Sequence, residues 1–423
     1  MTEQEQLIHS HHFENGLVLI GQSMPWLESA AFSFQVPAGC RYDPAHQIGV
    51  ANFVCEMVQR GAGERDSRQY IEALEALGVD YSSNASVYGT HYSGASCAGQ
   101  LEEALGIFAD VMRRPHFPEN QLEDGRQVCN QEIAAIEDDL PQRALLRLRE
   151  RYYGQPDGRD CHGTAQSVGS ITLNDLKTFY EKQYRPNGMI LGVAGKINWS
   201  ALKDHVGQLF ADWQHKPEIP PLKSPPQHGT CHLPFESQQT HIALAYPGVC
   251  YSHPDYYKQL GSVSVLSGGM SSRLFSEVRE KRGLCYTVFA SNHSVRDRGS
   301  VICYCGTSSD RAQESLDVIL QQLTNLREGI TEDELRRLKV QVRSDLIMQQ
   351  ESCRARAGSI TGDWFHFNRV RTLDEINSNI STLTVSEINQ FLEQNPPQTF
   401  DLVTLGSQPL EMDNNGISPT PIG

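Results

Sequence analysis

Two stretches of the chain, 205 residues apart, share one pattern. Residues 68–81 read RQYIEALEALGVDY and residues 273–286 read RLFSEVREKRGLCY, with an arginine, a glutamate, a glycine and a tyrosine at matching positions. A further helical run follows each stretch, at 101–112 and at 313–324. A layout that occurs twice predicts two similarly folded domains.

A run of prolines marks the boundary between these domains. Residues 215–229, HKPEIPPLKSPPQHG, contain five prolines and no apolar period, which is typical of a linker. A chain of 423 residues is also long for a single core. We therefore expect an N-terminal domain at 1–214 and a C-terminal domain at 230–423, joined by the linker 215–229.

Strand-like and helical segments follow one another irregularly in the first half. Apolar or alternating runs at 17–20, 30–36, 81–88 and 91–98 predict strands, and helical periods lie between them in pairs. This order differs from strict alternation of strands and helices. It predicts an α+β fold in which each domain has an antiparallel-rich sheet covered by helices.

The composition excludes several classes of function. The net charge is -15, and no basic cluster is available to bind a nucleic-acid backbone. The chain contains no apolar run of about eighteen residues, so no membrane span is expected. The first twelve residues, MTEQEQLIHSHH, are acidic and polar and lack the apolar core of a signal segment. The expected location is the cytoplasm.

The cysteines give no sign of a disulfide framework. There are eleven, an odd number without regular spacing, and they are expected to be reduced thiols. Cys303 and Cys305 alternate within an apolar run, which places both on one face of a strand and favours core packing over metal binding. The histidines of the HSHH segment at 9–12 are expected to precede the first strand and to be solvated.

Residues 49–60, GVANFVCEMVQR, predict a helix with two distinct faces. Apolar residues recur at helical spacing and form one stripe: Val50, Phe53, Val54, Met57 and Val58. Polar or polarisable residues form an adjoining face: Asn52, Cys55, Glu56 and Gln59. The stripe alone predicts a buried helix, whereas the four groups beside it are expected to point together and indicate a candidate site.

This helix resembles the zinc-binding helix of the pitrilysin/insulinase family of zinc peptidases, to which the mitochondrial processing peptidase is related. That family carries H-x-x-E-H inside the context G-x-A-H-F-L-E-H-M. The context is kept here, but Asn52 and Glu56 stand in place of the two histidines and Cys55 in place of the glutamate. Glu132, 76 residues beyond Glu56, stands where the family's third ligand is expected.

The altered positions do not suit catalytic zinc. Such zinc has three protein ligands and an open position for water, and the neutral amide oxygen of Asn52 binds it poorly. Cys55 lacks the carboxylate that would take a proton from the zinc-bound water. The resemblance therefore implies a helix that kept its packing and lost its chemistry, with no metal on this chain. A metal site made of Cys55, Glu56 and Glu132 is the alternative.

A second motif lies in the C-terminal half. Residues 267–288, SGGMSSRLFSEVREKRGLCYTV, resemble the same family's glycine-containing loop, helix and arginine–tyrosine segment, with Arg279 and Tyr286 seven residues apart. In the family such a pair reaches the zinc site of a facing domain and holds the substrate carbonyl as it becomes an oxyanion. The alternative is that Arg279 pairs with a surface acid and Tyr286 is half-buried core.

The resemblance implies that this chain is the zinc-less subunit of a heterodimeric peptidase. It would supply Arg279 and Tyr286 to a partner with an intact H-x-x-E-H motif and bound zinc, and the substrates would be small unfolded peptides. A non-enzymatic structural or peptide-binding homodimer is the second hypothesis. The third, a hydrolase using Cys55, lacks a histidine at helical spacing to activate the thiol, although His46 precedes the helix.

Overall fold

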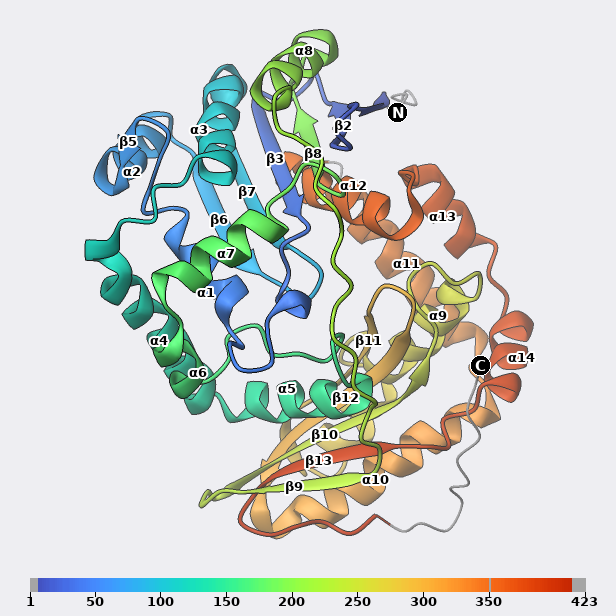
Figure 1. Ribbon diagram of the computed structural model, residues 1–423. Coiled ribbons are helices and arrows are strands. Elements are labelled where there is room, and N and C mark those ends of the chain that lie inside the picture. Colours follow the sequence, from blue (N-terminus) through green and yellow to red (C-terminus); the bar gives the residue numbers. More distant parts are fainter. Residues whose placement is uncertain (1–6, 350, 413–423) are drawn as a thin grey trace. The chain divides into compact units, whose positions relative to one another are not determined.

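The computed structural model describes residues 7–349 and 351–412, which form two compact units. The first unit contains residues 1–135, 159–224 and 347–372. The second contains residues 136–158, 225–346 and 373–423. Each unit combines one main sheet with helices, so the predicted α+β fold is confirmed (Figure 1).

The first unit is built on a six-stranded sheet with the order β1-β2-β8-β3-β7-β6. Its strands are β1 (Ile8–His12), β2 (Val18–Ser23), β3 (Ser29–Val36), β6 (Asp80–Ala85), β7 (Thr90–Cys97) and β8 (Ile190–Gly195). A small separate pair joins β4 (Gly61–Ala62) and β5 (Arg65–Asp66). Only β2 and β8 run parallel in the main sheet, because β8 returns after a long helical excursion.

Helices cover both faces of this sheet. They are α1 (Val50–Met57), α2 (Ser67–Ala76), α3 (Leu101–Arg113), most of α4 (Leu122–Asp138), α6 (Ala165–Ser170), α7 (Leu173–Gln183), α8 (Trp199–Phe210) and α12 (Cys353–Phe367). The large core lies between one face and helices that include α1, α3, α7 and α8. On the opposite face, Ala357 and Ile360 of α12 pack against Ala194 and Ile20.

The second unit repeats this strand order. Its sheet runs β9-β13-β10-β12-β11, with strands β9 (Thr230–Pro234), β10 (Gln239–Gly248), β11 (Cys285–Ser294), β12 (Gly299–Ser308) and β13 (Asp401–Gly406). The β9–β13 pair is parallel and the other pairs are antiparallel, as in the first unit. The predicted duplication is therefore present in the topology.

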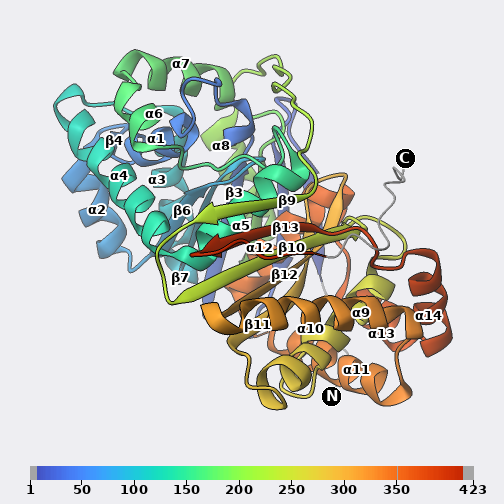
Figure 2. The same ribbon diagram turned by 90° about the horizontal axis from the view of Figure 1, so that it is seen from below.

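The helices of the second unit include one from the first half of the sequence. They are α5 (Leu140–Tyr153), α9 (Tyr256–Ser267), the short η4 (Phe275–Glu280), α10 (Ala312–Thr324), most of α11 (Glu332–Gln349), α13 (Leu373–Ser381) and α14 (Val385–Gln394). Helix α5 packs on β10 and β13, and α10 packs on β10 and β12 (Figure 2). The units therefore do not divide simply at residues 215–229. Helix α5 packs on the sheet of the C-terminal half, and α12 packs on the sheet of the N-terminal half.

The histidines near the N-terminus belong to a strand. β1 pairs with β2 across the turn at Asn15 and Gly16. The ring of His9 stacks on Trp199 at a centroid distance of 5.0 Å, and the ring of His12 lies 5.4 Å from that of Trp364. The expectation that the HSHH segment precedes the first strand is therefore wrong, because this segment forms most of β1. Aromatic neighbours contact the rings of His9 and His12.

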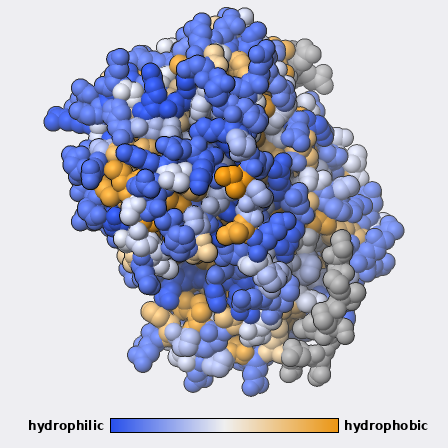
Figure 3. Space-filling view, in the orientation of Figure 1, coloured by the Kyte–Doolittle hydropathy of each residue, from blue (hydrophilic) through white to orange (hydrophobic). Residues whose placement is uncertain are grey.

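The surface agrees with the polar composition. The face shown in Figure 3 is mostly hydrophilic, with apolar side chains gathered in a few patches. No helix in the part of the chain that the structure describes is both long enough and apolar enough to cross a membrane.

Candidate functional site

Helix α1 begins at a buried carboxylate. The backbone N–H groups of Gly49 and Ala51 donate to the carboxylate of Asp43, over 2.8 and 3.2 Å. Gly49 has a φ of 99°, a conformation that glycine adopts without strain. Burial raises the pKa of Asp43 to about 8, against the opposing effects of these N–H groups and of Arg159. The N-terminus of α1 is thus held by hydrogen bonds from its backbone N–H groups to the carboxylate of Asp43.

The three altered positions and Glu132 do not share one environment. The side-chain amide of Asn52 donates to the carboxylate of Glu132 over 2.7 Å, so these two groups do meet. Glu56 forms an ion pair with Arg60 one turn later, also at 2.7 Å. Cys55 points into the core, where its side chain is only 3% exposed. The expectation that the polar groups of this helix point together is therefore wrong for Cys55.

The thiol of Cys55 is poorly placed for catalysis. Burial raises its pKa to about 12, although hydrogen bonds with Ser83 and Tyr92 lower it in part. A thiol becomes a nucleophile only as the thiolate, which this environment disfavours at neutral pH. The geometry therefore argues against the hypothesis of a Cys55 hydrolase.

The residues at this site do not fit a zinc ion. The side-chain N–H of Asn52 points toward Glu132, and Arg60 binds one oxygen of Glu56, so the two histidine positions hold an amide and an ion-paired carboxylate. Across residues 7–349 and 351–412, no three histidine, cysteine, aspartate or glutamate side chains gather in a way that could hold a metal. This set of side chains therefore differs from the histidine-containing donor set of a catalytic zinc site.

A loop beside this site contains two features that the sequence did not reveal. His162 contacts the carboxylate of Asp160 at 2.9 Å, and this hydrogen bond is the main cause that raises the pKa of His162, with a smaller contribution from the charge of Glu132. Cys161 forms a disulfide with Cys40. The prediction that all cysteines are free thiols is wrong for this pair, since sequence spacing gives no measure of their Cα distance of 5.2 Å.

Cys303 and Cys305 behave as the alternation predicts. Both lie on β12 with side chains that are at most 1% exposed, within the core of the second unit. The structure therefore places them among packing residues.

Arg279 and Tyr286 lie next to each other at the junction of η4 and β11. The guanidinium carbon of Arg279 is 5.3 Å from the ring centroid of Tyr286 and 4.9 Å from that of Phe275. The turn between them uses Gly283, whose φ is 59° and whose N–H donates to the carbonyl of Arg279. Buried Leu284 anchors the same turn by accepting a hydrogen bond from Thr307 at 2.6 Å.

The charges around this pair leave Arg279 available. Glu277 is bound by both Lys281, at 2.5 Å, and Arg282, at 2.6 Å. Arg279 forms no ion pair with any residue that the structure describes. Tyr286 is 83% exposed. The alternative in which Arg279 pairs with a surface acid and Tyr286 is half-buried core is therefore wrong.

Comparison with known families identifies the chain. Residues 19–164 match the model described as insulinase (peptidase family M16), and residues 170–342 match the model described as peptidase M16 inactive domain. The two matched segments together cover more than half of the sequence. The chain belongs to peptidase family M16.

Relatives of this M16 chain extend over nearly its whole length. It is 27% identical to the "uncharacterized zinc protease YmxG" of Bacillus subtilis, over 92% of this chain and 95% of that protein. It is 28% identical to the "uncharacterized zinc protease Rv2782c" of Mycobacterium tuberculosis, over 88% and 87%. A solved M16 inactive domain protein from Pseudomonas fluorescens matches with a TM-score of 0.86 and 24% identity, over 96% and 99%. A solved protease from Helicobacter pylori also has a TM-score of 0.86, with 21% identity over 95% and 99%. These structures show that the M16 chain has the pitrilysin-like fold.

Cys285 provides a reporter beside Tyr286 in this M16 chain. A hydrogen bond from Cys305 is the main cause that lowers the pKa of Cys285, and the positive charge of Arg279 contributes. We expect alkylation of Cys285 by iodoacetamide to begin at lower pH than that of a small free thiol, because more thiolate is present. Mass spectrometry of peptides labelled across a pH series measures this directly.

The buried Cys55 and the variant Arg279→Ala are the controls for this labelling. Cys55 should stay unlabelled until the protein is unfolded, because its side chain is inaccessible. Arg279→Ala should shift the labelling curve of Cys285 toward higher pH. An unchanged curve would show that Arg279 does not face this thiol in solution.

Proposed function

We propose that this chain is the zinc-less subunit of a heterodimeric M16 peptidase. Its partner carries the intact H-x-x-E-H motif and the zinc, and supplies the attacking water. This chain supplies Arg279 and Tyr286, which bind the carbonyl oxygen of a small unfolded peptide. The observation that carries the proposal is that this cation and this phenol are adjacent and exposed while Glu277 is occupied by Lys281 and Arg282.

The chemistry follows from the groups that the pair presents. During attack on an amide, negative charge develops on the carbonyl oxygen, and positioned donors stabilise that charge more than they stabilise the ground state. The guanidinium of Arg279 provides charged N–H donors and Tyr286 provides a phenolic O–H. The anchored turn around Gly283 limits how far the two groups can separate before substrate arrives.

The altered site on α1 supports a division of labour. Asn52 binds Glu132, Cys55 lies in the core and Glu56 pairs with Arg60. None of these three groups stands ready to activate water. The proposal places this heterodimer in the cytoplasm, which cell fractionation tests.

Reconstitution with a zinc-bearing M16 subunit tests the function. The purified chain alone should leave a quenched fluorescent peptide intact, and addition of the partner should give hydrolysis well above that of the partner alone. Size-exclusion chromatography should show a stable complex of the two. Equal rates with and without this chain, or a homodimer that binds the peptide without any partner, would favour the non-enzymatic alternative.

A further inference from the structure

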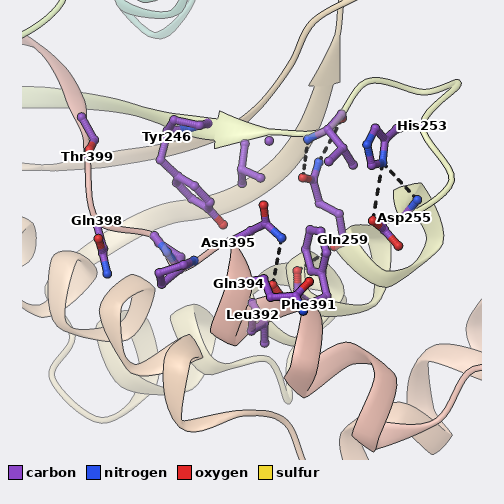
Figure 4. A pocket seen from close by; sticks show the side chains of 17 residues that line it. Tyr246, His253, Asp255, Gln259, Phe391, Leu392, Gln394, Asn395, Gln398 and Thr399 are labelled. Atoms are coloured by element: carbon purple, nitrogen blue, oxygen red, sulfur yellow. Dashed lines mark hydrogen bonds and ion pairs between the residues drawn. The ribbon is translucent and has the colours of Figure 1, made fainter. Parts of the chain in front are cut away.

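The second unit contains a cavity of about 380 Å³ that lies apart from Arg279 and Tyr286 along the chain. It is bounded by the end of β10, the start of α9, and the end of α14 with the residues that follow it (Figure 4). Its size lies within the range of about 300–1,000 Å³ that is typical of small-molecule sites. The residues in this unit therefore enclose enough space for a ligand of modest size.

Tyr246 is the unusual group in this cavity. It lies on β10 opposite Val301 of β12, and its side chain extends from the strand into the cavity (Figure 4). The residue is only 5% exposed, and its ring packs on Phe400 at a centroid distance of 5.8 Å. Its hydroxyl makes no hydrogen bond to any described residue. Burial raises the pKa of Tyr246, so the hydroxyl stays protonated and can donate to a ligand.

Two further polar side chains, His253 and Asn395, also line the cavity. The Nδ1 atom of His253 lies 3.1 Å from the backbone nitrogen of Asp255 and 3.8 Å from the carboxylate of the same residue. The carboxamide of Asn395 uses one N–H to bind the carbonyl of Phe391 at 3.1 Å, and its second N–H and its oxygen remain for a ligand.

Gln259 serves to shape the cavity. Its oxygen accepts from the N–H of Val249 at 2.6 Å, and its nitrogen donates to Asn292 at 2.9 Å. Because both ends of its side chain are engaged, Gln259 holds the end of β10 and leaves recognition to the other polar groups.

The charges around the cavity favour uncharged over strongly anionic ligands. None of the described residues that line it is a lysine or an arginine. The carboxylate of Asp255 also lines the cavity, and it forms an ion pair with Lys258 at 2.7 Å. Apolar side chains form the remaining wall: Val249, Val301, Phe391, Leu392 and Pro397. A phosphate or a free carboxylate would meet no lysine or arginine here, whereas an uncharged ligand with an aliphatic portion would be accommodated.

In the first unit, the segment after β3 is held by a loop that is distant in sequence. By strand order β3 corresponds to β10, and the segment after β3 is closed by the loop that follows α5. In that loop Cys161 forms the disulfide with Cys40, and Arg159 donates to the carbonyl of Cys40 at 3.2 Å.

We propose that this cavity binds a short uncharged peptide segment of about two residues. A backbone carbonyl accepts the hydrogen bond from Tyr246, the carboxamide of Asn395 pairs with a neighbouring peptide group, and an aliphatic side chain contacts Phe391 and Pro397. Peptide groups suit this cavity because each offers a donor and an acceptor without a charge. The site uses none of the groups assigned to the partner's reaction.

Calorimetric titration with N-acetyl-leucyl-leucinamide tests the proposal on the full chain. This capped dipeptide should bind, and the zwitterion Leu-Leu should bind more weakly because its carboxylate meets no cation. Tyr246→Phe should weaken binding of the capped dipeptide about three- to tenfold through loss of one hydrogen bond. Asn395→Trp, which places a large side chain at the cavity, should abolish it.

The matched control is Tyr251→Phe, which removes a hydroxyl from a tyrosine that does not line the cavity and packs on Tyr256 at a centroid distance of 4.8 Å. It should bind like the unmodified chain, and thermal unfolding should confirm that all variants fold. Failure of the capped dipeptide to bind, or full binding by both Tyr246→Phe and Asn395→Trp, would overturn the proposal. Loss of binding in Arg279→Ala with full binding in Tyr246→Phe would place the peptide at the Arg279–Tyr286 pair instead, which overturns this site and supports the proposed function.

Discussion

Replacing Arg279 by alanine should lower kcat/KM of the reconstituted peptidase about a hundredfold. The loss of one positioned donor to a developing oxyanion typically has an effect of roughly this size or larger. Tyr286→Phe should also lower the rate, by a smaller factor, because a neutral hydroxyl is a weaker donor than a guanidinium. Steady-state hydrolysis of a quenched fluorescent peptide by each reconstituted variant measures both effects.

Arg282→Ala is the matched control for this series. Arg282 lies three residues from Arg279 in the same turn, but its side chain is bound to Glu277 at 2.6 Å. Lys281 remains to pair with Glu277 in that variant, so the turn should keep its shape and the rate should change little. If Arg279→Ala and Arg282→Ala gave the same rate, the role proposed for Arg279 would be untenable.

Asp363→Ala should destabilise the first unit by about 3–5 kcal/mol, because it removes one partner of a buried ion pair. Asp363 and Arg371 are 3% and 4% exposed and are paired at 2.7 Å. The carboxylate of Asp363 also accepts a hydrogen bond from the backbone N–H of Arg371 at 2.9 Å. Burial lowers the pKa of Arg356, and the negative charge of Asp363 opposes that effect. Urea unfolding followed by circular dichroism measures the loss of stability.

Two further variants separate the effect of this buried pair from the general effect of removing an acid. Asp333→Ala removes an exposed aspartate that pairs with Arg336 and Arg337, and it should leave the free energy of unfolding almost unchanged. Asp363→Ala combined with Arg371→Met removes both buried charges and should recover part of the loss. An Asp363→Ala protein as stable as the Asp333→Ala protein would contradict the prediction.

The sequence predicted the repeated architecture but did not show which helix covers which sheet. The matching stretches at 68–81 and 273–286 correspond to α2 leading into β6 and η4 leading into β11, at the same edge of each sheet. Amphipathic spacing shows that a helix has a buried face, yet it contains no information about the partner of that face. The position of α12 depends on contacts such as Arg356 with Gln22, which are 334 residues apart.

The candidate site was predictable where it rests on motif positions and unpredictable where it rests on packing. The resemblance located Asn52, Glu132, Arg279 and Tyr286, and the structure brings each of these two pairs together. Helical spacing alone could not show that Cys55 turns into the core. The exposure of Tyr246 to a cavity depends on chain segments that are distant in sequence, so no local pattern could reveal it.

The reciprocal placement of α5 and α12 has a consequence for cutting this protein in two. A gene split at the prolines of 215–229 would give an N-terminal product without α12 and a C-terminal product without α5. Each product would expose an uncovered sheet face to water, which favours aggregation when either is made alone. When both fragments are produced in one cell, α5 and α12 can each pack on the sheet of the other fragment. We therefore expect soluble protein from co-expression where separate expression of either fragment gives aggregates.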